Sequence, residues 1–175
     1  MKRQSCVLAA ALALAIGGGA VALAAAPGAP KPVKEVGGQW FDKDSAPTYN
    51  ISKDGTVDWS TFVGYLRYNS ICLDCHGPDG AGSSYAPDLT QALKQVDYAQ
   101  FIADVAGGIK SVNTAQDLVM PSFATNKNVM CFINEIYTYL RARSTGALGR
   151  GRPPKHAPAP KGFNKASYKC LGIPM

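Results

Sequence analysis

The chain has 175 residues, of which 46% are hydrophobic, a composition ordinary for one globular domain with a packed core. Its net charge of +6 conceals a split: residues 25–140 carry eight basic and all twelve acidic side chains, whereas residues 141–175 carry eight basic side chains and no acid. This split indicates an acidic body with a basic tail, which either folds back onto the body or steers docking. Nucleic-acid binding fits poorly, the more so because the N-terminus predicts export.

The N-terminus has the pattern of a secretory signal peptide. Lys2 and Arg3 precede an apolar run from Val7 to Ala26 that is rich in alanine and leucine. The triplet Ala22-Leu23-Ala24 matches the small-x-small cleavage rule, so we expect the mature chain to begin at Ala25. A retained membrane anchor is the alternative, but the run is marginal for spanning a bilayer. We therefore expect removal of the signal and no stable membrane insertion.

Composition divides the chain into a signal peptide (1–24), an N-terminal arm (25–57), a helical body (58–143) and a basic tail rich in proline and glycine (144–175). The arm is predicted to be irregular, with a turn at Lys53-Asp54-Gly55-Thr56 between short extended pieces. No convincing sheet pattern appears in any segment.

The body carries clear helix signals. Asp58 is suited to cap a helix that runs into Cys72, since apolar residues follow it at positions i, i+3, i+4 and i+7. Asp97 caps a second predicted helix that ends near residues 107–108, and a shorter helical stretch covers 91–96. The last helix is expected to begin near Asn126. Its apolar face comprises Val129, Phe132, Ile133, Ile136 and Leu140. The fold class predicted is therefore a small all-α domain.

The run Cys72-Leu73-Asp74-Cys75-His76 has the CxxCH spacing of covalent haem attachment. Two thiols on one turn of backbone can add to the two vinyl groups of one porphyrin, which holds His76 under the iron as the proximal ligand. A dithiol redox pair and half of a zinc site are the alternatives. The chain lacks the second close cysteine pair of a zinc ribbon and the βαβ pattern of a thioredoxin. We predict one covalent haem c, and a periplasmic location, because bacteria attach this haem outside the cytoplasm.

The order helix, CxxCH, proline-containing loop, helix, Met-Pro, final helix resembles that of class I cytochrome c. Gly64 and Tyr68 precede Cys72 by eight and four residues, as the small and aromatic residues do in that family, where they meet the last helix near Ile136 and Tyr139. The resemblance also implies a role for Pro87. Its carbonyl would accept the Nδ1 proton of the proximal histidine and so orient the ring.

Four side chains are candidates for the sixth iron ligand: Met120, Met130, His156 and Met175. Met120 precedes Pro121 on a predicted loop between two helices, where the resemblance places the axial methionine. A buried methionine that fills a packing gap is the alternative at this position. A His/Met pair closes both axial positions and raises the reduction potential, which favours electron transfer over oxygen or peroxide chemistry.

Two cysteines remain after the haem pair and the cysteine of the signal peptide are set aside. In an oxidising compartment Cys131 and Cys170 are expected to form a disulfide that folds the tail over the body. Two unpaired thiols are the alternative.

These extra cysteines, the N-terminal arm and the haem segment together resemble the four-cysteine c-type cytochromes of methanol metabolism. The resemblance implies an electron carrier, not an enzyme, whose donor is a PQQ-dependent methanol or alcohol dehydrogenase and whose acceptor is another cytochrome or a terminal oxidase. Two alternatives stay open: a haem with an open axial site for sensing or catalysis, and a carrier for an unrelated dehydrogenase.

Overall fold

The structure, a computed structural model, describes residues 29–112 and 117–174, so the predicted signal peptide (1–24) lies outside the described residues. The helices are α1 (Trp59–Ile71), α2 (Leu73–His76), the 3₁₀ turn η1 (Pro78–Gly80), α3 (Leu89–Ala92), α4 (Tyr98–Gly107), α5 (Lys127–Met130), α6 (Ile133–Ser144) and α7 (Phe163–Leu171). The strands are β1 (Lys34–Val36), β2 (Gln39–Phe41), β3 (Pro47–Thr48), β4 (Ile109–Val112) and β5 (Asp117–Met120).

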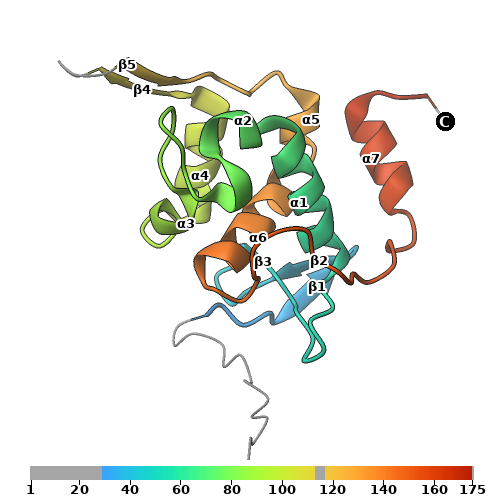
Figure 1. Cartoon of the computed structure of the whole chain (residues 1–175). Coiled ribbons are helices and arrows are strands. Elements are labelled where there is room, and N and C mark those ends of the chain that lie inside the picture. The colour runs from blue at the N-terminus through green and yellow to red at the C-terminus, as the bar shows by residue number, and fades with distance from the viewer. Residues whose placement is uncertain (1–28, 113–116, 175) are drawn as a thin grey trace, which may run out of the picture.

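Helices α1 and α6 cross at the centre of the molecule, with the β1–β3 sheet at one end and the β4–β5 hairpin at the other (Figure 1). A Cβ on Gly64 would lie 1.9 Å from the carbonyl oxygen of Glu135, so only glycine permits this close crossing. The rings of Tyr68 and Tyr139 pack beside it with centroids 5.4 Å apart. The predicted meeting of the first and last helices is confirmed.

The predicted helix starts are confirmed at Asp58, Asp97 and Asn126, each of which accepts a backbone hydrogen bond in the first turn of its helix. Two predictions were wrong in extent. The short helix begins at Leu89 instead of residue 91, because the Asp88 carboxylate caps it. The last helix is divided into α5 and α6 by a non-helical residue at 132, where φ is −130° and ψ is 22°.

The predicted all-α fold class is confirmed, but the expectation that no segment forms a sheet was wrong. Strands β1, β2 and β3 form an antiparallel sheet, and β4 pairs with β5 in a hairpin. These strands have two to four residues, too few for an alternating pattern to stand out. The Arg141 guanidinium of α6 lies 2.7 Å from the Asp42 carboxylate at the end of β2, which joins the arm to the body. Burial alone would raise the pKa of Asp42, but hydrogen bonds from Arg141 and from the amide of Ala46 lower it below its usual range.

The basic tail folds back onto the body, one of the two outcomes expected from the charge split. Val57 donates its N–H to the carbonyl of Lys155 at 3.1 Å and accepts from the N–H of Ala157 at 2.9 Å. The His156 ring stacks on Phe62 with centroids 3.8 Å apart. After these contacts of residues 155–157 the chain forms α7, a helix that the composition of the tail did not predict.

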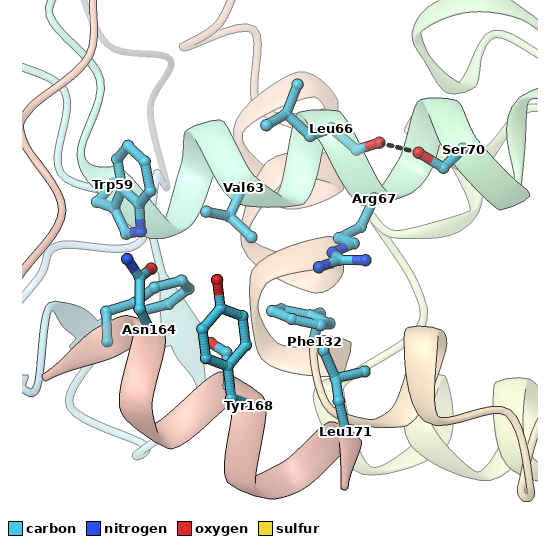
Figure 2. Close-up of a pocket in the computed structure, with 11 residues that line it drawn as sticks. Trp59, Val63, Leu66, Arg67, Ser70, Phe132, Asn164, Tyr168 and Leu171 are labelled. Atoms are coloured by element: carbon cyan, nitrogen blue, oxygen red, sulfur yellow. Dashed lines mark hydrogen bonds between the residues drawn. The ribbon is translucent and has the colours of Figure 1, made fainter. Parts of the chain in front are cut away.

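The predicted disulfide between Cys131 and Cys170 is confirmed. It joins the C-cap of α5, between α5 and α6, to the last turn of α7. Helix α7 stands off from α1 and leaves a groove of about 310 Å³ between them, bordered by Trp59 and Leu66 on one side and Tyr168 on the other (Figure 2). Among the described residues, no helix is both long enough and apolar enough to span a bilayer.

The double variant Cys131→Ser/Cys170→Ser is expected to lose about 3–4 kcal/mol of unfolding free energy, because the bridge closes a long loop in the unfolded chain. The two cysteines are 39 residues apart. Guanidinium unfolding followed by far-UV circular dichroism measures the loss, and reduced wild-type protein should show the same value. A loss below about 1 kcal/mol in both samples would show that the tail lies outside the cooperative unit.

Candidate haem site

The CxxCH segment continues the first helix almost without interruption. Cys72 ends α1, and α2 follows at once, with the N–H of His76 donating to the carbonyl of Cys72 at 2.9 Å. The two thiols therefore sit on one helical turn, as attachment to a single porphyrin requires. The Cys72 side chain is partly buried against the hydrophobic core, and Cys75 is exposed.

The thiol environment bears on the alternatives of a redox pair or a zinc ligand. Burial, with a smaller effect of the Cys75 thiolate, raises the pKa of the Cys72 thiol to about 11. A redox-active pair needs a thiolate, which this setting disfavours. A thioether is uncharged, so it suits the partly buried position of Cys72. Among the described residues, no group of three or more histidines, cysteines or acids is placed to bind a metal ion.

His76 is buried, with 7% of its surface exposed, and its Nδ1 lies 3.1 Å from the carbonyl oxygen of Pro87. A carbonyl can only accept, so Nδ1 must carry the proton and donate it. The Nε2 lone pair is then available for a metal, and the ring orientation is set by the bond to Pro87. The structure thus places His76 and Pro87 together, as the resemblance implied, and this donor set fits a haem iron.

The loop after His76 is closed by hydrogen bonds around the histidine. Gly82 donates its N–H to the carbonyl of His76 at 2.8 Å, and the Tyr68 hydroxyl donates to the carbonyl of Gly77 at 2.5 Å. Gly77 has φ +70°, and a Cβ there would lie 2.3 Å from the carbonyl oxygen of Gly82. Glycine is therefore required at this position for both its backbone angle and the close approach.

Met120 comes from a separate part of the chain. It was expected on a loop, but it is the last residue of β5, where it pairs with Ile109. Its side chain is partly buried against the core cluster. The segment that follows is held to the end of α4, with the N–H of Phe123 donating to the carbonyl of Val105 at 3.0 Å. Backbone bonds on both sides therefore hold this strand end, which suits a residue that supplies a ligand.

The other sixth-ligand candidates are placed differently. His156 stacks on Phe62, ten residues before Cys72 in α1, and thus about 15 Å away along the helix axis. Met130 ends α5 and is partly buried against the core cluster. Met175 lies outside the described residues.

Sequence reasoning missed an acid that joins the haem loop to the tail. Asp79, three residues after His76, is buried with 7% of its surface exposed. Its carboxylate accepts from the N–H of Gly151 at 2.9 Å and lies 3.2 Å from the Nε of Arg150. Arg143 adds a bond to the carbonyl oxygen of Asp79 at 3.3 Å. No local pattern signals these contacts, because the partners are 64 to 72 residues apart in the sequence.

Three known proteins resemble the chain. It is 48% identical over 134 residues to cytochrome c-553I of Paracoccus denitrificans, a match that spans 77% of this chain but only 59% of the relative. It is 35% identical over 96 residues to cytochrome c-555 of Methylococcus capsulatus, covering 54% of this chain and 72% of the relative. The crystal structure of the c-type cytochrome XoxG from Methylobacterium extorquens AM1 superposes with a TM-score of 0.74 at 47% identity, covering 82% of this chain and 87% of that chain. No protein-family profile matches the chain.

The helical fold, the CxxCH turn and these relatives agree, and the chain belongs to the class I c-type cytochromes. Membership implies a covalently attached haem c. Within the class it is related to XoxG, which has the same fold over most of its length.

Proposed function

We propose that the mature chain, without residues 1–24, is a periplasmic monohaem electron carrier that is not itself an enzyme. Its donor is a PQQ-dependent methanol or alcohol dehydrogenase, and its acceptor is another cytochrome or a terminal oxidase. The observation that carries this proposal is the pairing of the His76–Pro87 contact with 47% identity to XoxG. The narrower resemblance to four-cysteine methanol-metabolism cytochromes, with the Cys131–Cys170 bridge, supports the choice of donor.

The residues assigned to the haem divide between attachment and ligation. Cys72 and Cys75 hold the porphyrin through thioethers, His76 provides one axial ligand through Nε2, and Met120 provides the other. The bound haem supplies a one-electron couple. The chain supplies the tether, the orientation of His76 by Pro87, and two axial ligands that exclude small molecules from the iron. A filled coordination sphere favours electron transfer over the alternative of an open site for sensing or catalysis.

The surface beside Cys75 is the proposed site of contact with redox partners. In the loop that follows His76, Pro78 and Ala81 are exposed, whereas Gly77 and Gly80 are buried. Tyr85 adds an aromatic side chain that is 72% exposed. An accessible edge of this kind suits brief contacts with a partner, because transient redox complexes bury little surface.

Stopped-flow mixing with a purified PQQ-dependent alcohol dehydrogenase from the same organism tests the donor. Substrate-reduced dehydrogenase should reduce the ferric cytochrome at a rate that increases with dehydrogenase concentration, whereas dehydrogenase without its alcohol should not. An unrelated periplasmic dehydrogenase that reduces the cytochrome faster would replace the proposed donor and leave the electron-carrier class intact. Carbon monoxide binding by the reduced wild-type protein would support the open-site alternative instead.

A further inference from the structure

The eight basic side chains of residues 141–175 fall into two groups in the folded protein. Five of them already have partners in the folded protein: Arg141 and Arg143 belong to α6, and Arg150, Arg152 and Lys155 hold the tail to the body. Arg141, Arg150 and Lys155 pair with Asp42, Asp79 and Asp54 at 2.7, 3.2 and 3.7 Å, Arg143 donates to the carbonyls of Asp79 and Leu148, and Arg152 lies over the Phe62 ring.

The other three basic side chains are Lys161, Lys165 and Lys169. All three residues are exposed, and within the described part of the chain none has a carboxylate at salt-bridge distance. Lys165 and Lys169 are four residues apart in α7 and lie on one face of it, and Lys161 directly precedes the N-cap residue Gly162. Helix α7 contains no acid. We name these three residues the basic ridge.

The opposite face of α7 is turned toward α1. Phe163, Tyr168 and Leu171 line the groove against α1, and the rings of Phe163 and Trp59 meet edge to face at 5.8 Å. Figure 2 shows Tyr168 and Leu171 extending from α7 toward α1. A helix that lies on a membrane needs a free apolar face beside its cationic one. Because the apolar face of α7 is turned toward α1 and away from the lysines, the basic ridge suits an acidic protein surface better than a lipid surface.

The basic ridge is also held in place at both ends. The stacking of His156 on Phe62 fixes the chain before α7, and the Cys131–Cys170 bridge fixes the last turn. Lys127 adds a bond from its Nζ to the carbonyl of Leu171 at 3.5 Å. Lysines on an anchored helix lose less conformational freedom on docking than lysines on a loose tail, so the anchoring favours recognition.

We propose that the basic ridge docks against an acidic patch of the donor dehydrogenase and orients the cytochrome for electron transfer. This inference rests on the proposed function and names the surface that the donor recognises. Helix α7 runs along the side of α1, from Trp59 near its own start toward Arg67 near its own end, so the last turn of α7 is its part nearest the haem segment that follows α1 (Figure 2). Opposite charges at such a site raise the association rate and set orientation.

The test compares two triple variants of the holoprotein in stopped-flow reduction over a range of ionic strength. Lys161→Gln/Lys165→Gln/Lys169→Gln removes the basic ridge. The matched control, Lys34→Gln/Lys53→Gln/Lys94→Gln, removes the same charge from exposed lysines elsewhere. At low ionic strength we expect the ridge variant to be reduced about tenfold more slowly than wild type, with a nearly flat salt dependence. The control should change less than about twofold, and the haem spectrum should stay the same in both.

The outcomes separate the two proposals. Equal rates and salt dependence in the ridge variant and the control would overturn the basic ridge while keeping the donor. If the dehydrogenase does not reduce the wild type at any ionic strength, the proposed donor is wrong. The dehydrogenase is then also not the partner of the basic ridge. Sedimentation with phosphatidylglycerol vesicles tests whether the basic ridge binds lipid instead of the dehydrogenase. Vesicle binding lost only in the ridge variant, together with unchanged reduction, would assign the surface to lipid and overturn the inference.

Discussion

Replacing Met120 with alanine should open one axial position of the haem and lower the reduction potential by on the order of 100 mV or more. The thioether favours the ferrous state, so its loss makes reduction harder. The reduced variant should bind carbon monoxide, and the oxidised variant should lose the sulfur-to-iron charge-transfer band at the red end of its spectrum. Potentiometric titration and carbon monoxide difference spectra measure both effects.

Met130→Ala is the matched control, because Met130 is also partly buried against the core cluster but ends α5 instead of the β4–β5 hairpin. We expect it to lose about 2 kcal/mol or more of stability through lost packing, with little change in potential. If the Met130 variant binds carbon monoxide and the Met120 variant does not, the sixth ligand has been misplaced. If neither does, the axial partner is another residue.

The parts of the fold that sequence predicted are those specified by local signals. Asp58, Asp97 and Asn126 cap helices through carboxylate or amide oxygens that reach the first turn, so the signal and the structure are only a few residues apart. The CxxCH segment is likewise recognised from five consecutive residues. The Tyr68–Tyr139 contact is distant in sequence, and it was found only through the family resemblance.

The parts that were missed depend on partners far along the chain. Strand β3 has two residues and is held by β2 and by α6, through contacts such as the bond from Arg141 to the carbonyl of Pro47, 94 residues away. Helix α7 follows a segment rich in proline and glycine, and its position depends on the groove with α1 and the Cys131–Cys170 bridge. Propensity in such segments is weak, and tertiary contacts decide the outcome.

The tail and the haem loop form one connected structure through Asp79. Its carboxylate binds the segment around Arg150, while the next part of the tail is clamped at Val57 and the last part is joined to Cys131. The clamped tail therefore braces the loop that follows the CxxCH segment. It also presents the basic ridge in a fixed place relative to the haem, which a free basic extension would not do.

The second large effect is expected at the attachment cysteines. Either Cys72→Ala or Cys75→Ala should leave one vinyl group of the porphyrin unreacted, so at most one thioether forms. An unreacted vinyl stays conjugated with the ring, and the pyridine haemochrome spectrum should shift to longer wavelength in each variant. The Cys131→Ser/Cys170→Ser variant is the control. It removes two cysteines outside the CxxCH segment, and its haemochrome spectrum should match wild type.

The two attachment variants should differ in stability although they share the spectral shift. The Cys72 side chain is partly buried against the core at the end of α1, and Cys75 is exposed. Cys72→Ala should therefore lose about 1 kcal/mol more unfolding free energy than Cys75→Ala, because it also leaves a packing defect. Mass spectrometry of the denatured proteins and guanidinium unfolding monitor attachment and stability separately. Unchanged haemochrome spectra in both single variants would refute thioether attachment at this pair. A spectral shift with equal stability losses would refute only the packing role of Cys72.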